Sequence, residues 1–300
     1  MSSLKTNQSR GSSVGAWNDL HRAIVAEDVE RVISLLEDEQ TDVDEPTPQR
    51  QNTPLHLACM DGQEEIVTLL LAHGAQVDVQ NADGETPLHF AVRSGSHAVI
   101  RVILREAREL LETTDLDNLT PLHWAVLEDD RETIKLLLAE GADVFAETLT
   151  EGNAAFLAAT QGSVESLEIL LEACPALLQS VDDDGNSLLH LAASLDLEDV
   201  VRVLLAAGVR TDLLNDDDET AEDVSVSDTI TALIQCHADS PLDPPSSLSS
   251  SSSSSPSLSV VSSPSSSTPP SPLQEPETRR NNVPLLSLPS CPSSPPLLSS

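Results

Sequence analysis

Aromatic residues are scarce in this 300-residue sequence, which contains no tyrosine, three phenylalanines and two tryptophans. A core built from this chain must therefore be aliphatic, rich in leucine, valine and alanine. No apolar run approaches the roughly 20 residues that a membrane-spanning helix needs. Residues 1–15 also lack the apolar stretch of a secretory signal peptide. We therefore expect neither a membrane span nor secretion.

Basic residues are the second shortage. The chain has 15 Lys and Arg against 50 Asp and Glu, a formal net charge of −35. Within residues 17–239 the counts are 11 and 47, a net charge of −36. Binding to DNA or RNA needs clustered basic residues that displace counterions, and anionic membrane surfaces attract the same residue types. The composition therefore argues against nucleic acid and membrane surfaces as partners.

Paired cysteines are also missing. Cys59, Cys174, Cys236 and Cys291 are scattered singly, with no Cys-x-x-Cys motif. Three of them fall at helical positions of the repeats described below, which favours buried, reduced thiols over disulfides. Reduced thiols are typical of intracellular proteins. We expect a cytoplasmic location and leave a nuclear one open.

One short motif recurs along most of the chain. It reads TPLHLACMDG at 53–62, TPLHFAVRSG at 86–95, TPLHWAVLED at 120–129 and SLLHLAASLD at 187–196, with a degenerate NAAFLAATQG at 153–162. The start points 53, 86, 120, 153, 187 and 220 are separated by 33 or 34 residues. A sustained period in this range predicts a stacked array of repeats.

Each repeat is predicted to form two short antiparallel helices. Thr53, Thr86 and Thr120 are good N-caps, and the proline after each sits at the first helical position, where its missing N–H costs nothing. Apolar residues recur at equal offsets in the second helices: Val67, Ile100, Ile134, Leu167 and Val201, then Leu70, Ile103, Leu137, Leu170 and Leu204. The same face must be buried in every unit, which a single repeat could not cover.

The pattern resembles the ankyrin repeat family in its TPLH opening, in the small pair Ala192-Ala193 and in the closing Gly141-Ala142-Asp143. The resemblance implies an all-α solenoid of stacked helix-turn-helix units with hairpin finger loops. We divide the ankyrin repeat domain, residues 17–239, into units near 17–50, 51–83, 84–117, 118–150, 151–184, 185–217 and 218–239. Residues 1–16 and the Ser/Pro-rich tail 240–300 are expected to be disordered.

Several units depart from the pattern. Asn153-Ala154-Ala155-Phe156 lacks the histidine and proline, and the last unit lacks the apolar leucine, as suits a terminal cap. In the third unit, RVILREARELLETTDLDN at 101–118 has no glycine to end its second helix. We therefore expect that helix to run longer, with an altered loop after it.

No enzyme signature is present. The chain lacks a phosphate-binding glycine loop, a G-x-S-x-G elbow and a histidine pair at metal spacing. His56, His89, His123 and His190 recur once per repeat, and the resemblance implies that they join neighbouring loops by hydrogen bonds. The run Asp182–Asp184 lacks the alternating ligands and the position-12 glutamate of a calcium loop. We predict a non-catalytic protein without cofactor or metal.

Acidic residues gather where the resemblance places the finger tips and the ends of the first helices, which line a concave binding face. They are Asp83, Glu85, Asp115, Asp117, Glu128, Asp129, Asp130, Asp182, Asp183, Asp184, Asp216, Asp217 and Asp218. One acid per finger has an ordinary cause, because Asp closes such turns, but three or four in each of the last two fingers do not. General solubility is the alternative explanation. We predict a groove for a Lys/Arg-rich protein segment, with Met60, Leu127 and Leu195 as apolar anchors.

The tail, residues 240–300, contains 24 serines and 14 of the chain's 20 prolines. Its six Ser/Thr-Pro steps are candidate sites for proline-directed kinases, although such a composition also produces them by chance: Ser240, Ser255, Ser263, Thr268, Ser271 and Ser294. Two apolar patches, VPLLSLP at 283–289 and PPLLSS at 295–300, are candidate docking peptides.

The sequence thus predicts a monomeric, non-catalytic adaptor or inhibitor that binds a basic segment of another protein. A substrate-recognition subunit of a ubiquitin ligase and a scaffold like a proteasome assembly chaperone are the alternatives. The first of these would require a helical recruiting box after the array, which the Ser/Pro-rich tail does not offer. A structural spacer also remains open, because the same fold serves many functions.

Overall fold

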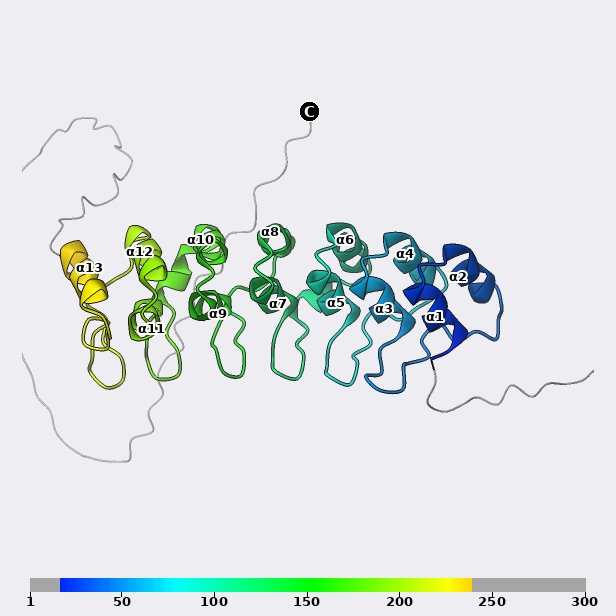
Figure 1. Ribbon diagram of the computed structural model, residues 1–300, viewed down its shortest axis with the longest axis horizontal. Coiled ribbons are helices and arrows are strands. Elements are labelled where there is room, and N and C mark those ends of the chain that lie inside the picture. Colours follow the sequence, from blue (N-terminus) through cyan, green and yellow to red (C-terminus); the bar gives the residue numbers. More distant parts are fainter. Residues whose placement is uncertain (1–16, 239–300) are drawn as a thin grey trace, which may run out of the picture. The chain divides into compact units, whose positions relative to one another are not determined.

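A computed structural model describes residues 17–238 of the chain. Figure 1 shows its helices in two rows, with finger loops extending beyond one of them. The helices of the row beside the fingers, here called inner, are α1 (Asp19–Val25), α3 (Pro54–Met60), α5 (Pro87–Arg93), α7 (Pro121–Leu127), α9 (Ala154–Gln161) and α11 (Leu188–Ser194). The outer helices are α2 (Val29–Leu36), α4 (Glu64–Ala72), α6 (His97–Glu106), α8 (Arg131–Glu140), α10 (Val164–Ala173) and α12 (Glu198–Ala206). The predicted all-α solenoid is confirmed.

The last unit is a reduced one. Residues 221–224 form only a turn where the other units have an inner helix, and α13 (Asp228–Ala238) then packs against α12. The buried residues Ile230 and Ile234 cover the end of the core. This is the atypical cap that the sequence predicts.

The inner helices begin in the way that the motif predicts. At Thr53 the side chain accepts the His56 amide, while the Thr53 N–H donates to His56 Nδ1 over 3.1 Å. His56 Nε2 then donates to the Glu85 carbonyl in the next finger, over 3.1 Å. His89 and His190 reach the Leu119 and Glu219 carbonyls in the same way, over 3.2 and 3.0 Å. The implied bridging role is confirmed for these three histidines.

The fourth histidine of the motif is buried without this bridge. Within residues 17–238, His123 Nε2 forms no hydrogen bond of normal geometry, although the Ala146 backbone of the next finger lies near the ring. Burial lowers the pKa of both His56 and His123 to about 4. Both rings are therefore neutral at physiological pH, so they act as fixed hydrogen-bonding parts of the core.

The expectation of a longer helix in the third unit is wrong. Helix α6 ends at Glu106, and after Ala107 the chain enters a 3₁₀ helix, η1 (Arg108–Glu112). The break turns the chain back so that Leu110 and Leu111 are buried in the core. The fifth unit repeats this arrangement with η2 (Pro175–Gln179), and these are the two units with a 34-residue spacing.

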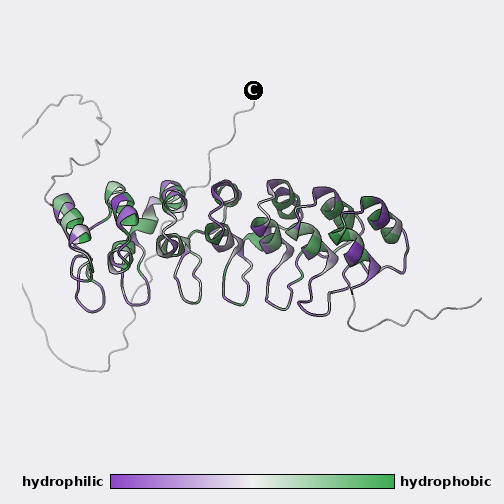
Figure 2. Ribbon diagram, viewed as in Figure 1, coloured by the Kyte–Doolittle hydropathy of each residue, from purple (hydrophilic) through white to green (hydrophobic). Residues whose placement is uncertain are grey.

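The core is aliphatic, as the composition requires. All ten apolar residues predicted to face inward from the second helices, from Val67 to Leu204, are 0% exposed. Figure 2 shows the hydrophobic residues concentrated in the helices, where neighbouring units stack. A fully buried Leu, Ile or Val contributes about 1.5–3 kcal/mol, so this repeated face holds the array together.

None of the helices within residues 17–238 is both long enough and apolar enough to span a membrane. The predictions for residues 1–16 and for the tail lie outside the described residues. They include the six Ser/Thr-Pro steps, the two apolar patches and Cys291.

Candidate functional site

Neighbouring finger loops are joined at their tips by backbone hydrogen bonds. An amide of one finger donates to a carbonyl of the preceding finger in four places: Ala82 to Arg50 (2.8 Å), Leu116 to Asp83 (3.1 Å), Leu149 to Asp117 (3.3 Å) and Asp216 to Asp184 (3.1 Å). Bonds of this kind hold the two tips that they join against each other. Among the described residues no such bond joins the fourth finger, at Leu149, to the fifth, at Asp184. The first four tips and the last two are therefore held as two separate groups.

One polar side chain closes each of four fingers. Asn81 Oδ1 accepts the amides of residues 83 and 85, both over 2.9 Å, and Asn215 Oδ1 accepts those of residues 217 and 219. Asp115 and Asp182 do the same in their own fingers, over 2.8–3.0 Å. These two aspartates thus have the local turn-closing role that was expected of one acid per finger.

Two acids of the finger at residues 76–85 have basic partners, whereas Asp78 is exposed and forms no ion pair with another described residue. Glu85 is buried, accepts from Asn81 Nδ2 over 2.7 Å and lies 3.6 Å from the Arg93 guanidinium. Asp83 lies 3.6 Å from Arg50, in an exposed pair. The prediction that Glu85 lines a binding face is therefore wrong, because its carboxylate is enclosed by the protein itself.

Arg93 belongs to a cluster that links two units. Its guanidinium lies over the Phe90 ring, 4.5 Å from the centroid, and 5.4 Å from the centroid of Trp124. Trp124 Nε1 donates to Asp115 Oδ2 over 2.9 Å. Asp115 therefore has no carboxylate oxygen left without a hydrogen bond.

The acids at the end of α7 also divide by role. Asp130 caps α8 and accepts from the Thr133 hydroxyl over 2.6 Å. Asp129 accepts from the Ser166 hydroxyl over 2.6 Å. Only Glu128 is exposed with no side-chain partner in the part of the chain that the structure describes. Two of these three acids therefore connect parts of the array to one another.

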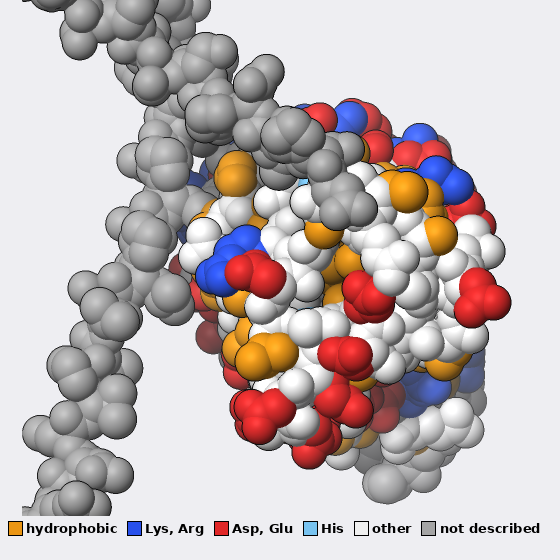
Figure 3. Space-filling model, turned by 90° about the vertical axis from the view of Figure 1, so that its left-hand side faces the viewer, with side chains coloured by type: hydrophobic (Ala, Val, Ile, Leu, Met, Phe, Trp, Pro, Cys, Tyr) orange, Lys and Arg blue, Asp and Glu red, His pale blue; other side chains and the backbone are white. Residues whose placement is uncertain are grey.

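The tips of the last two fingers are different. Five exposed carboxylates there form neither an ion pair nor a side-chain hydrogen bond with any of residues 17–238: Asp183, Asp184, Asp216, Asp217 and Asp218. We call these five residues the fingertip acids. The nearest base along the chain, Arg210, is held by Asp212 through two bonds of 3.0 Å. Figure 3, viewed from the α13 end, shows acidic side chains gathered in the lower part, where the fingers lie.

Asp117, in the third unit, is exposed and also has no ion pair with another described residue. It shares its finger with Asp115, whose carboxylate is occupied. The unpaired negative charge therefore increases from the third unit to the last two fingers.

The three predicted apolar anchors are partly exposed, with 37% of Met60, 40% of Leu127 and 46% of Leu195 accessible to solvent. Met60 and Leu127 end inner helices two units apart, whereas Leu195 follows the end of α11. Sequence reasoning missed Leu116 and Leu149, which are 69% and 66% exposed at consecutive finger tips. A leucine within an otherwise polar finger is the signal that could have identified them.

Within residues 17–238, no group of three or more His, Cys, Asp or Glu side chains is arranged to hold a metal ion. The acids that lie close together in sequence point outward at finger tips or are occupied by amides. What the arrangement can do is present fixed negative charge, next to apolar side chains, along one edge of the array.

A family model described as "Ankyrin repeats (3 copies)" matches residues 20–110 and 122–215. Among curated proteins, the chain is 32% identical over 202 residues to the transient receptor potential cation channel subfamily A member 1 homolog of Caenorhabditis elegans. That match covers 67% of this chain and 16% of that protein. Human ankyrin repeat domain-containing protein 13C is 38% identical over 99 residues, which cover 33% of this chain and 18% of that protein. The chain thus spans less than a fifth of either relative.

Among solved structures, the ankyrin repeat domain of Bcl-3, described as a unique member of the IkappaB protein family, superposes with a TM-score of 0.67 at 29% identity. The alignment covers 74% of this chain and 99% of that domain. The human ASB11 ankyrin repeat domain gives a TM-score of 0.61 at 24% identity, over 75% of this chain and 100% of that one. The second likeness supports the fold alone.

Proposed function

Because the chain belongs to the ankyrin repeat family, whose arrays are protein-interaction domains, we propose that its fingertip acids bind a basic segment of another protein. The protein would then act as a non-catalytic adaptor or inhibitor. Its relatives are diverse, and one fold serves many partners, so the partner's chemistry has to be argued from the surface itself.

The observation that carries the proposal is the absence of basic partners for the five fingertip acids within residues 17–238. Acids on neighbouring tips repel one another, since the spacing of stacked units, roughly 8–10 Å, is comparable to the Debye length of about 8 Å at physiological salt. A Lys/Arg-rich segment would remove this repulsion on binding. It would also associate rapidly, because opposite charges steer the encounter.

Apolar contacts would lie beside the charge. Leu116 and Leu149 occupy tips between the neutralised fingers and the fingertip acids, and Met60, Leu127 and Leu195 lie at the inner-helix ends. Apolar residues at the centre of an interface commonly carry much of its binding energy. The partner segment would therefore combine basic and apolar residues.

The likeness to the ankyrin repeat domain of Bcl-3 supports an interaction array and does not separate an adaptor from an inhibitor. Neither a ubiquitin-ligase receptor nor a proteasome assembly scaffold is favoured by a particular observation. A monomeric array in the cytoplasm or nucleus fits the proposal, and the buried thiol of Cys59, whose pKa burial raises, suits a reducing compartment.

The test is binding of a fluorescent Gly-(Lys-Arg)₃ peptide to the full chain, followed by anisotropy at about 50 and about 300 mM salt, which span the physiological screening regime. A variant with all five fingertip acids changed to Asn should bind at least about tenfold more weakly, the equivalent of about 1.4 kcal/mol. Asn keeps the shape of Asp without its charge, and Asn118 already stands at the place equivalent to Asp218 with a φ of 60°.

The matched control changes five exposed outer-helix acids to their amides, namely Glu30, Glu64, Glu65, Glu106 and Asp199. It alters the net charge equally, so it should retain most of the affinity. Equal weakening in both variants would mean that the peptide responds only to overall charge. That result would overturn the proposed site.

A further inference from the structure

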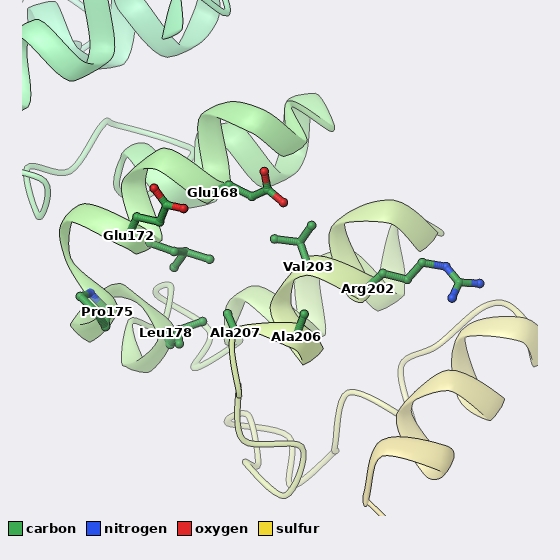
Figure 4. Close-up of a pocket in the computed structure, with 9 residues that line it drawn as sticks. Glu168, Glu172, Pro175, Leu178, Arg202, Val203, Ala206 and Ala207 are labelled. Atoms are coloured by element: carbon green, nitrogen blue, oxygen red, sulfur yellow. The ribbon is translucent and has the colours of Figure 1, made fainter. Parts of the chain in front are cut away.

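A groove opens on the outer side of the array, between α10 with η2 on one wall and α12 on the other (Figure 4). It encloses about 530 Å³, which falls in the range of about 300–1,000 Å³ that is typical of ligand sites. Its lining is largely apolar and includes Leu171, Leu178, Val203, Ala206 and Ala207. It is separate from the finger loops, which extend from the inner row.

The rim of the groove favours a cation. Glu168 and Glu172 lie one turn apart on α10, are exposed and have no ion pair with any of residues 17–238. Arg202 is paired with Glu198 on its own helix, and it extends away from the other lining side chains in Figure 4. Residues at the C-terminal ends of both helices, Glu172 of α10 and Ala206 of α12, line the groove, and helix C-termini carry partial negative charge.

The third and fourth units contain the same backbone arrangement, but there the chain fills the space itself. Ala107 (φ −147°, ψ 87°) matches Cys174 (φ −142°, ψ 88°) before the 3₁₀ helix. In this earlier copy the Arg108 guanidinium donates to the carbonyl of Glu140 at the end of α8. Its Nη2 lies 3.4 Å from where a Cβ on Gly141 would be.

At the groove, this arginine is absent. Pro175 stands where the earlier copy has Arg108. Apart from Gly208 and its two chain neighbours, no atom of the described residues lies within 4 Å of where a Cβ on Gly208, the counterpart of Gly141, would be. The rim has changed sign as well, because Glu168 and Glu172 replace Arg101 and Arg105 of the third unit. The later copy therefore combines an open space, unpaired acids and a helix end.

We propose that this groove binds an arginine side chain carried on an apolar segment of a partner protein. The guanidinium would occupy the space beside Gly208, donate to the Ala207 carbonyl as Arg108 does to Glu140, and lie near Glu172. Apolar neighbours in the partner would pack on Leu178 and Val203. Arginine suits the site because its planar fork reaches a carbonyl and a carboxylate together, and such charge-assisted bonds are strong.

The first measurement uses the full chain with ¹³C-labelled Leu and Val methyl groups, titrated with acetyl-Leu-Arg-Ala-Leu-Leu-amide. Saturable shifts of the Leu178 and Val203 methyls are expected. The same peptide with citrulline in place of arginine keeps the shape and loses the charge, and it should bind at least about tenfold more weakly.

The second measurement fills the groove from within. Pro175→Arg transplants the arginine of the earlier copy onto a backbone that already has matching angles, and it should abolish peptide binding. Ala206→Trp blocks the groove from an exposed position on α12 and provides a second route, should the first variant not fold. Ala72→Trp, at the equivalent exposed end of α4, is the matched control and should leave binding unchanged.

The absence of saturable shifts at millimolar peptide would overturn the proposal, as would equal affinity for the arginine and citrulline peptides. Binding that survives both groove variants would place the peptide elsewhere, for example on the fingertip acids. Self-association of the chain that Ala206→Trp removes, without competition by the peptide, would assign the groove to a second copy and also overturn the proposal.

Discussion

The finger at residues 76–85 and the finger at residues 212–219 have nearly the same backbone and opposite electrostatics. In both, an asparagine closes the turn, Asn81 in one and Asn215 in the other. In the first, Glu85 is buried against Arg93 and Asp83 faces Arg50. In the second, Asp216, Asp217 and Asp218 have no basic partner within the described residues.

The difference shows that the number of acids in a loop does not measure the charge that the loop offers a partner. A carboxylate that is already paired costs energy to separate from its base, because the base would be left uncompensated. An unpaired, exposed carboxylate loses only its hydration and its repulsion from neighbours. This is why we propose the end of the array near α13, rather than the finger at residues 76–85, as the place for a basic ligand.

The largest effect that separates the two regions should come from pH. Burial holds the folded pKa of His56 and His123 near 4, below the unfolded value of about 6.5. The unfolded chain therefore binds protons first, so this stability is complete above about pH 6.5 and is lost as pH falls toward 4. At pH 5 each of these histidines should lower the free energy of unfolding by about 2 kcal/mol relative to pH 7. Urea unfolding at the two pH values would measure this.

Hydrogen exchange would locate this loss. Amides of α3 and α7, which contain these two histidines, should lose protection at pH 5 before those of α9, where Phe156 replaces the motif histidine. Uniform loss along the array would mean that the histidines do not determine which region opens first.

Arg93→Ala should leave the finger at residues 76–85 with an unpaired acid, as in the finger at residues 212–219. The free energy of unfolding should fall by about 2–3 kcal/mol. The change leaves Glu85 buried without its base, which is costly, and removes the contacts with the Phe90 and Trp124 rings. Urea unfolding of the full chain at pH 7 is the measurement. Adding Glu85→Gln should recover part of the loss, and the absence of any recovery would show that ring packing alone was responsible.

Changing the five fingertip acids to Asn should stabilise the array by about 1 kcal/mol at low salt, because it removes their mutual repulsion. The gain should shrink as salt screens the charges, which thermal unfolding at two ionic strengths would show. The outer-helix control defined above should gain less. Equal gains would indicate a diffuse field rather than a local cluster.

The smallest effect is expected for Arg50→Ala, which should lower the free energy of unfolding by less than about 0.5 kcal/mol. The pair with Asp83 is exposed on both sides, and surface ion pairs of this kind contribute little. The informative readout is binding, since the change frees one more fingertip carboxylate. Affinity for the basic peptide should rise slightly; a fall would mean that Arg50 itself contacts the ligand.

Much of the fold follows from local rules that the sequence displays directly. The capping threonines, the prolines after them and the apolar positions from Val67 to Leu204 act within a turn or two of their own helix. The bridging histidines were implied by the family resemblance. The break at Ala107 was missed because it depends on burying Leu110 and Leu111 in a core formed by other units.

The site was harder to predict because ion pairing across the fold is invisible in a list of acids. Glu85 and Glu219 occupy equivalent places in their fingers, yet only Glu85 is followed by an inner helix, and that helix ends at Arg93. The turn-closing roles of Asp115 and Asp182 and the cap at Asp130 are local and could have been anticipated. The groove beside Pro175 required a comparison of two units in three dimensions.

The hydrogen bonds that join neighbouring finger tips in four places, the last two tips among them, fix the spacing of the tips that they join. Stacked units repeat about every 10 Å, and an extended peptide advances about 3.3 Å per residue. A ligand lying along the edge therefore passes one tip for about every three of its residues. If the proposed basic segment lies along this edge, basic side chains about three residues apart would meet the acids of the last two tips.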